Sequence, residues 1–459
     1  MKKLISKLRF LIAMAAGKCA ALGLRLLGRN ATYLPGLIAL KLCPDLLGQL
    51  KKPETLICVT GTNGKTTTSN FLTSVLTSTG ERVTNNSFGS NVQAGVATAL
   101  MVNSTLFGRH KNKTAVIEVD ERSSPRIYPY ITPDYLIVNN IMRDSLKRNA
   151  HTEFISWVLS TYIPASTKLI LNGDDIICSS LAKQCKDRTY FGLDAERPEH
   201  TEGMRARDVV YCPVCGGALE AEYLRYNHIG RMHCTVCGYA TPERDFLVTA
   251  IDRENALFTV RHDGEEKTYK LVSDNVVNVY NFCGAIALLT RLGVTYEQIT
   301  GAFQNAEIVK TRYVRETVGD AGLTMILSKG QNPVAVSRVF SYVSKCDGDD
   351  KAILVMVDDK ADNTNNVENT CWLYDLDYSP LKAAGIKRIV FAGRRCYDHQ
   401  LRAAMTGLDP EKLVFTPEVK DSVLLLDPKA HKDLYILYDN YLLDDARREE
   451  KTLKEALAV

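Results

Sequence analysis

Apolar runs of about five residues alternate with longer stretches of helical apolar spacing through most of the chain. Continuous short runs are typical of strands buried on both faces, so the alternation predicts doubly wound α/β architecture with parallel sheets. The strands predicted in the first half of the chain are 55–60, 114–119, 135–139 and 168–172. Those predicted in the second half are 323–327, 352–357, 388–392 and 434–438.

One stretch interrupts the alternation. Residues 205–244 are rich in cysteine and precede two strand-like segments at 246–250 and 257–261, so we interpret them as an inserted module. A helix at about 278–292 is expected to close the central domain. We therefore predict three parts: an N-terminal helical segment 1–50, a central domain 51–310 with the insertion 205–244, and a C-terminal α/β domain 311–459.

The N-terminal residues 1–28 have a basic start and an apolar run, but Lys18 and Arg25 interrupt it and no cleavage site follows. Apolar residues recur at helical spacing, which predicts an amphipathic helix with a basic side. Packing on the protein body and contact with an anionic membrane surface both fit this pattern. No apolar run approaches the roughly 18 residues of a membrane span, so we expect no transmembrane helix.

Composition narrows the class of protein. A chain of 459 residues with 45% hydrophobic and 24% charged residues is expected to form two or three globular domains. The formal net charge of +4 gives no general case for nucleic-acid binding. The 13 cysteines are an odd number and are mostly scattered, which favours a reducing cytoplasm over a disulfide framework.

A glycine-rich loop directly after the first predicted strand carries the strongest chemical signal. It is two residues shorter than the usual phosphate-binding loop, yet it still wraps backbone N–H groups around phosphates at a helix N-terminus. Lys65 would reach the β- and γ-phosphates of ATP, and a hydroxyl from Thr66 or Thr67 would bind Mg²⁺. The loop residues are Gly61, Thr62, Asn63, Gly64, Lys65, Thr66 and Thr67.

The insertion carries two C-x-x-C pairs separated by 18 residues, Cys212 with Cys215 and Cys234 with Cys237. This spacing is typical of a Cys₄ zinc ribbon. Four thiolates complete a tetrahedral shell with no open position, so we expect a structural Zn²⁺ site. His228 and His233 lie inside the loop, and we expect them to be surface or packing residues.

The loop Thr60–Thr67 resembles the ATP-binding loop of the Mur ligases, the cytoplasmic enzymes that build the peptidoglycan stem peptide. Within that family the chain is similar to the MurT group over nearly its whole length. The segments that carry the similarity are Tyr33–Gly36, Asn86–Asn91, Glu118–Glu121, Asn139–Asp144, Leu171–Asp175, Asn278–Asn281, Gly393–Arg395 and Asp398.

The resemblance implies residue roles in the central domain. Glu118 ends a predicted strand beside the loop, where its carboxylate could hold Mg²⁺ with support from Asp120; a helix N-cap role is the alternative for either. The family also places an Arg near phosphate in its hinge, here Arg312 or, less clearly, Arg315. Around the nucleotide, the resemblance places Asn140, Asn172, Asp174 and Asn281.

The resemblance extends to the C-terminal domain. Lys329 matches a position that could stabilise charge on the γ-phosphate, although a surface lysine is the alternative. An acidic, Trp-containing stretch of MurT proteins supplies a carboxylate that orients the catalytic His of a glutaminase partner. Asp375 is the preferred match, with Asp362 and Asp377 as alternatives, and the chain departs from the family pattern over 363–370. A cap or solvated Asp is the competing interpretation.

The implied activity is ATP-dependent amidation of the D-glutamate α-carboxylate of lipid II to D-isoglutamine through an acyl phosphate. Ammonia would come from a GatD-like glutaminase subunit, and the lipid-linked substrate would place the enzyme in the cytoplasm, at the inner membrane surface. Two alternatives stay open: an amino-acid-adding ligase of the Mur or folylpolyglutamate type, and a non-catalytic ATP-binding regulatory subunit.

Overall fold

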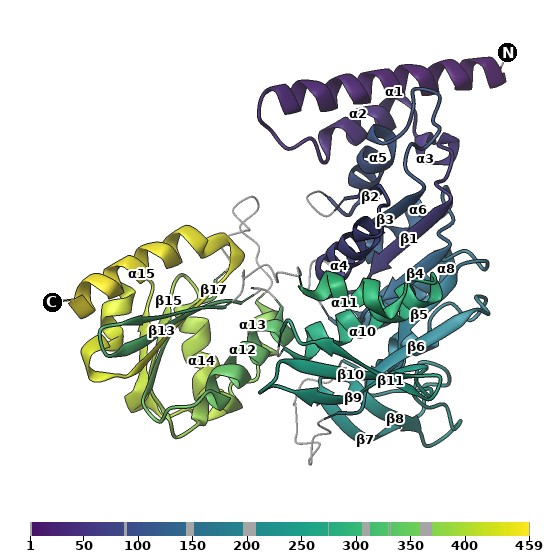
Figure 1. Cartoon of the computed structure of the whole chain (residues 1–459). Helices are drawn as coiled ribbons and strands as arrows, with labels where there is room; N and C mark the ends of the chain where they lie inside the picture. The colour runs from purple at the N-terminus through teal and green to yellow at the C-terminus, as the bar shows by residue number, and fades with distance from the viewer. Residues whose placement is uncertain are drawn as a thin grey trace. The chain divides into compact units, whose positions relative to one another are not determined.

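The chain folds into two compact units, and Figure 1 shows its elements in chain order. The computed structural model describes residues 2–86, 90–143, 151–195, 208–273, 275–304, 313–328, 330, 332–358 and 370–458. The first unit comprises Met1–Met142, His151–Glu202 and Val209–Ile308. The second comprises Arg143–Ala150, Gly203–Asp208 and Val309–Val459.

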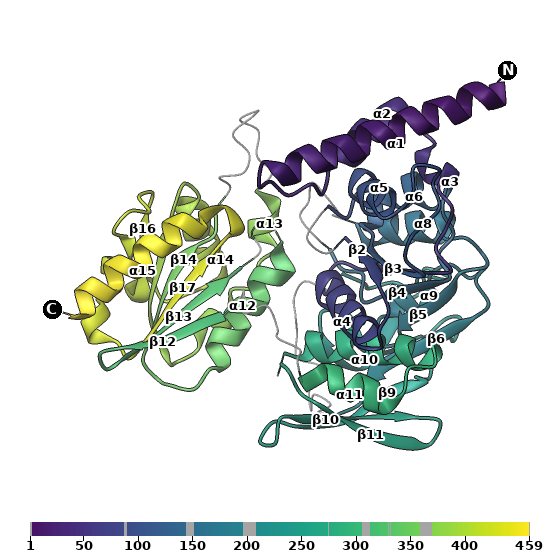
Figure 2. The same cartoon turned by 45° about the horizontal axis from the view of Figure 1, so that its top comes forward.

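The first unit begins with three helices, α1 (Lys2–Leu26), α2 (Leu34–Leu42) and α3 (Leu46–Gln49). The predicted N-terminal helix is therefore confirmed. It lies along α2 in both views (Figures 1 and 2) and joins the same hydrophobic core as the sheet through Phe10, Ala13 and Met14. None of the helices in the described residues is long and apolar enough to cross a membrane.

A nine-stranded sheet forms the centre of this unit, in the order β11-β10-β9-β6-β5-β4-β1-β3-β2. The seven strands from β9 to β2 are parallel, and β10 and β11 extend the sheet in antiparallel fashion. The strand bounds are β1 (Thr55–Thr60), β2 (Val83–Asn85), β3 (Thr114–Glu118), β4 (Tyr135–Val138), β5 (Lys168–Asn172), β6 (Arg188–Leu193), β9 (Phe246–Asp252), β10 (Leu257–His262) and β11 (Glu265–Lys270).

Helices cover both faces of this sheet, because each crossover between parallel strands returns over one face. The helices of one face are α4 (Lys65–Ser78), α10 (Val276–Arg291) and α11 (Tyr296–Gln304). Those of the other are α5 (Gln93–Val102), α6 (Ser124–Ile127), α8 (Thr152–Tyr162) and α9 (Ile176–Ser180). The central strands are buried on both sides, which explains their continuous apolar runs.

The cysteine-rich insertion forms a small antiparallel sheet of β7 (Leu219–Tyr226) and β8 (Ile229–Cys234). Its hairpin turn rests on the main domain, where Gly230 N donates to the Asp174 carbonyl at 2.8 Å. Met232 on β8 belongs to the core of the unit. The insertion is therefore packed onto the main domain of the first unit through its hairpin.

The second unit is built on a six-stranded sheet in the order β12-β13-β17-β14-β15-β16. All strands but β12 run parallel. The strands are β12 (Tyr313–Val318), β13 (Ala321–Leu327), β14 (Lys351–Met356), β15 (Ile386–Ala392), β16 (Leu413–Thr416) and β17 (Asp433–Tyr438). One core lies between the sheet and α12 (Pro333–Lys345), α13 (Cys371–Tyr374) and α14 (Cys396–Thr406); the other lies beneath α15 (Leu443–Ala458). All four strands predicted in this part of the chain are confirmed.

Candidate nucleotide site and four-cysteine cluster

The glycine-rich loop joins β1 to α4 at the carboxyl edge of the first sheet, as the sequence predicts. Gly61 (φ +129°) and Gly64 (φ +84°) adopt backbone conformations that favour glycine. A Cβ on Gly64 would lie 2.1 Å from Asn281 Oδ1, so the α10 side chain packs directly against the loop. The structure therefore brings Asn281 to the phosphate loop, where the sequence places it.

Lys65 is the first residue of α4, and its ammonium group donates to the Gly61 carbonyl and to Glu121 Oε1, the latter at 3.3 Å. Glu121 is almost fully buried. Burial lowers the pKa of Lys65, but Glu121, Glu118 and Asp120 outweigh it and hold that pKa above its usual value. The loop thus presents a permanent cation. Sequence reasoning did not single out Glu121 as its partner.

Glu118 at the end of β3 lies beside Thr66, whose Oγ1 donates to Glu118 Oε2 at 2.9 Å. Asn91 Nδ2 donates to the other carboxylate oxygen at 3.0 Å, and Asn86 accepts from the Glu118 backbone N–H at 2.7 Å. Hydroxyl and carboxylate oxygens together suit a hard cation such as Mg²⁺. Asp120 instead caps a short 3₁₀ helix, η1 (Glu121–Ser123), by accepting from Arg122 N.

The Asn140 side chain is hydrogen-bonded to the backbone of the phosphate loop. Its Oδ1 accepts from Asn63 N at 2.9 Å and its Nδ2 donates to Asn63 O at 3.1 Å. Next to it, Met142 N donates to Thr62 Oγ1 at 2.9 Å. The segment after β4 therefore fixes the backbone of the phosphate loop at two successive residues.

Asn172 and Asp174 are fully buried below this segment. Asn172 Nδ2 donates to the Asn139 carbonyl at 3.0 Å. Asp174 Oδ2 accepts from Tyr280 OH at 2.7 Å and from Leu193 N at 2.8 Å, and burial raises the pKa of this carboxyl despite nearby Arg244. Both side chains thus brace β5, β6 and α10 against one another. Arg312, also assigned to the nucleotide, lies outside the described residues.

A buried ion pair connects the insertion to the same segment. His228, at the turn between β7 and β8, places Nε2 3.1 Å from Asp175 Oδ1, and neither residue has any exposed side chain. Asp175 Oδ2 also accepts from Ile141 N at 2.8 Å, one residue from Asn140. Burial would raise the pKa of Asp175, but His228 and the backbone donors hold it below its usual value. Of the two roles expected for His228, surface or packing, the structure shows packing, because its imidazole is buried against Asp175.

The four cysteines of the insertion converge on one point. Their Sγ atoms all lie within 4.8 Å of one another, with 3.7 Å between Cys212 and Cys237 and 3.5 Å between Cys215 and Cys234. Four sulfurs about 2.3 Å from a tetrahedral Zn²⁺ are about 3.8 Å apart, so this geometry fits a tetrahedral metal site. Backbone N–H groups of Val214 and Val236 point at the sulfurs.

The acidic candidates of the second unit differ in their surroundings. Asp377 Oδ1 accepts at 2.9 Å from the backbone N–H of Ser379, the first residue of a short 3₁₀ helix, η3 (Ser379–Lys382). Asp375 follows α13, and its side chain is 41% exposed, with Arg143 Nη1 at 3.2 Å. Asp362 and Lys329 lie outside the described residues, as does the side chain of Arg315.

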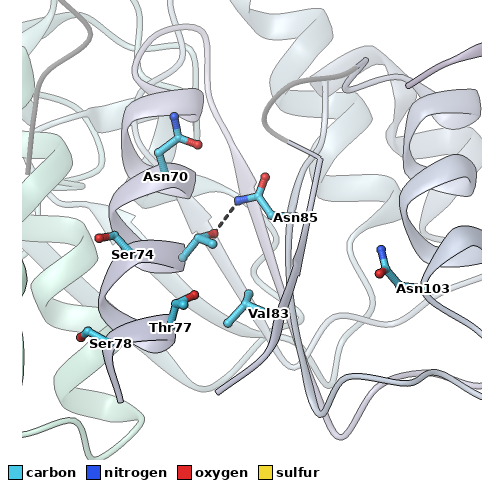
Figure 3. A pocket seen from close by; sticks show the side chains of 8 residues that line it. Asn70, Ser74, Thr77, Ser78, Val83, Asn85 and Asn103 are labelled. Carbon is cyan, nitrogen blue, oxygen red and sulfur yellow. Dashed lines mark hydrogen bonds between the residues drawn. The ribbon is translucent and has the colours of Figure 1, made fainter. Parts of the chain in front are cut away.

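Figure 3 shows a surface hollow on the first unit between α4 and β2, away from the phosphate loop. Its lining includes no charged side chain, and Asn85 bonds across to α4. Because neutral amides and hydroxyls offer neither a nucleophile nor a phosphate-binding cation, we assign the chemistry to the loop at Gly61–Thr67 instead.

Two family models match the chain. The Mur ligase middle domain matches residues 59–213, and the MurT ligase C-terminal domain matches residues 329–441. The chain is 29% identical over 422 residues to the MurT subunit of lipid II isoglutaminyl synthase from Staphylococcus aureus, covering 91% of this chain and 93% of that protein. The corresponding subunit from Streptococcus pneumoniae is 28% identical, with 94% of each chain covered.

Solved structures show the same fold at lower identity. A type C pseudomurein peptide ligase from Methanothermus fervidus superimposes with a TM-score of 0.63 at 18% identity, covering 90% of this chain and 81% of that one. MurF from Acinetobacter baumannii gives a TM-score of 0.59 at 17% identity, covering 92% and 80%. The chain therefore shares its fold with these two proteins.

Proposed function

The chain belongs to the MurT group of the Mur ligase family, and from this premise we propose that it catalyses ATP-dependent amidation of lipid II. It is an ATP-dependent ligase. One observation carries the proposal: a phosphate loop with a part-buried cation, Lys65, stands beside the paired oxygens of Thr66 and Glu118. The MurT-type C-terminal domain separates the chain from ligases that add an amino acid.

ATP would bind with its phosphates on the N–H groups of Gly61–Thr67, at the N-terminus of α4. Lys65 would exchange its bonds to Gly61 and Glu121 for phosphate oxygens, which Glu121 then keeps oriented. Thr66 and Glu118 would hold Mg²⁺, which neutralises charge on the β- and γ-phosphates when bound. Asn281, Asn140, Asn172 and Asp174 would keep the loop in place from below.

The reaction would proceed in two displacements. A D-glutamate α-carboxylate oxygen attacks the γ-phosphorus, and the bond between the γ-phosphorus and the β,γ-bridging oxygen breaks. ADP departs, and the substrate is left as an acyl phosphate. Ammonia then attacks the acyl carbon, the carbon–oxygen bond to phosphate breaks, and nitrogen loses a proton as D-isoglutamine forms. Charge neutralisation by Lys65 favours the first displacement, because charge shifts onto phosphate oxygens as the bond to ADP breaks.

A GatD-like glutaminase subunit would supply the ammonia. We propose that Asp375 serves this partner, because it is the preferred match to the acidic stretch of the MurT group and its side chain is 41% exposed. A carboxylate at this position would fix the tautomer of a catalytic histidine. Arg312 near the phosphates remains a proposal from the resemblance alone.

The cysteine cluster would hold a structural Zn²⁺. Its four sulfurs leave no open coordination position for a reactant, so the metal would stabilise the fold of the insertion and take no part in the chemistry. The hairpin it stabilises is the one that carries His228. The enzyme would work in the cytoplasm, at the inner membrane surface, where lipid II is held.

Hydroxylamine trapping tests carboxylate activation. The protein is incubated with lipid II, ATP, Mg²⁺ and hydroxylamine in place of ammonia, and the lipid is examined by mass spectrometry. An acyl phosphate yields a hydroxamate, and the product should disappear when ATP is left out. ATP consumption with no hydroxamate would contradict the proposal and favour a subunit that binds ATP without performing the ligation.

A further inference from the structure

Helix α1 has two apolar faces, and among the described residues of the first unit only one of them is covered by protein. On the covered face, Phe10, Ala13, Met14 and Ala21 are buried in the first unit. A Cβ on Gly17 would lie 2.5 Å from Met101 Sδ on α5, which shows how closely the helices approach. These contacts attach the helix to the body of the unit over most of its length.

A charged clamp fixes the same helix. Lys18 Nζ donates to the carbonyls of Met101 (2.8 Å), Val102 (3.1 Å) and Ser104 (2.6 Å) at the end of α5. Cations near the last carbonyls of a helix are favourable, because those groups have no intrahelical donor. The direction in which α1 presents its outer face is therefore set by the fold of the unit.

The outer face is a stripe of exposed apolar residues, which we call the outer stripe. Its members recur every three or four positions and so share one side of the helix. They are Leu4, Leu8, Ile12, Ala15, Cys19, Leu22 and Leu26. Leu4 is 73% exposed, Leu8 58% and Leu26 80%. From residue 4 to residue 26 the stripe runs about 33 Å at 1.5 Å per residue.

The charged side chains around the outer stripe are mostly basic, and the first acidic residue along the chain, Asp45, lies beside Arg9. The first 44 residues hold eight basic side chains and no Asp or Glu, whereas the whole chain has 57 basic and 53 acidic residues. By helical spacing, Lys7 and Arg25 flank one edge of the stripe and Arg9 flanks the other. The basic residues are Lys2, Lys3, Lys7, Arg9, Lys18, Arg25, Arg29 and Lys41.

We propose that the outer stripe of α1 lies in the plane of an anionic lipid surface, with its leucines among the acyl chains and its flanking cations on the headgroups. A long apolar stripe between basic edges, without acidic residues, is the chemistry of interfacial helices. The outer stripe is thus expected to contact a lipid bilayer rather than another protein. The link to catalysis rests on the proposed function: the stripe would hold the ligase at the surface that carries its lipid-linked substrate.

Vesicle flotation tests this directly with the full chain. Wild-type protein should float with vesicles of equal phosphatidylcholine and phosphatidylglycerol, less with phosphatidylcholine alone, and less at high salt. Leu8→Glu/Ile12→Glu should weaken binding to the mixed vesicles by roughly tenfold or more, since two apolar side chains no longer enter the lipid. The matched control is Leu401→Glu/Met405→Glu, an equally spaced exposed pair on α14, which should bind as wild type.

Three results would overturn the proposal: no flotation of wild type, equal flotation of the Leu8/Ile12 variant, or loss of self-association in that variant with vesicle binding unchanged. Unfolding curves of both variants establish that each is folded. Amidation of a short-chain, water-soluble lipid II analogue separates this inference from the proposed function. If the protein amidates the analogue but does not bind vesicles, the proposed function stands and only the proposed membrane contact of α1 is refuted.

Discussion

His228 Nε2 lies 3.1 Å from Asp175 Oδ1, and the two side chains are completely buried although 53 residues separate them. Asp175 also receives the backbone N–H of Ile141, which adjoins the segment that holds the phosphate loop. The insertion that carries the cysteine cluster is thereby connected, through one carboxylate, to the segment whose Asn140 is hydrogen-bonded to the phosphate loop. Its hairpin is therefore packed against the residues that support the phosphate loop.

Replacing His228 should therefore affect stability and nucleotide binding together. His228→Ala leaves the buried Asp175 carboxylate without its imidazole partner, and we expect a loss of about 2–3 kcal/mol in the free energy of unfolding. ATP affinity should fall while metal content stays the same, because His228 is not a ligand. His233→Ala is the matched control: His233 lies in the same hairpin, its side chain is 54% exposed, and it pairs with exposed Glu220. Equal effects of the two substitutions would refute the connection.

Lys65→Ala should reduce turnover by roughly 10²–10³-fold or more, because a preorganised cation at the transferred phosphoryl group is lost. The fold should persist. It should be modestly destabilised, because the buried Glu121 carboxylate no longer has Lys65 as its partner. Lys52→Ala, which removes an exposed ion pair with Asp134 in the same unit, should turn over as wild type. Substantial activity in the Lys65 variant, measured as ADP release with lipid II, would remove the assignment of the loop.

Metal analysis of the native protein should find about one zinc per chain. Cys212→Ser/Cys215→Ser should lose that metal and lower the thermal midpoint, because the binding free energy of a structural site contributes to folding. Cys371→Ser, at an exposed cysteine of the second unit, should keep both the zinc and the thermal midpoint of the native protein. A native protein free of zinc, or a double variant as stable as wild type, would contradict a structural zinc.

The second unit should lose stability in mild acid because of His399. Burial lowers the pKa of His399 to about 4, with the Val357 carbonyl and Asp398 opposing the shift. The unfolded chain binds a proton near pH 6.5, so stability is constant above that pH and falls as pH drops toward 4. Between pH 7.5 and 5 the loss from this group is about 2 kcal/mol.

The buried Trp372 allows this loss to be measured in the second unit, by denaturant titration followed by fluorescence in a Trp157→Phe background. His399→Gln can keep bonds to Tyr378 and to the Val357 carbonyl but does not titrate. Between pH 7.5 and 5, the free energy of unfolding of the variant should therefore fall by about 2 kcal/mol less than that of the wild type. An unchanged pH profile in the variant would show that another group is responsible.

Strands buried on both faces could be predicted from the sequence, since their apolar runs carry the signal locally. β1, β14 and β17 are examples. β2 has three residues and β12 is largely polar, so each is defined by its pairing with a neighbour rather than by its own pattern. Such pairings depend on tertiary structure that a local pattern does not contain.

The same distinction holds for the site. The phosphate loop and the paired cysteines were predictable because their chemistry lies within a few consecutive residues. Glu121 and His228 were not, because their partners are 56 and 53 positions away and become neighbours only in the folded sheet. A buried histidine in a polar turn has no distinguishing mark in the sequence.

The most direct test of the central claim is mass spectrometry of lipid II after incubation with the protein, ATP, Mg²⁺ and ammonium, with and without a glutaminase partner and glutamine. We expect a product in which one carboxyl hydroxyl is replaced by an amino group, located by fragmentation at the D-glutamate α-carboxyl. A product that forms only with an added amino acid, and that gains a residue, would contradict amidation and leave an amino-acid-adding Mur ligase.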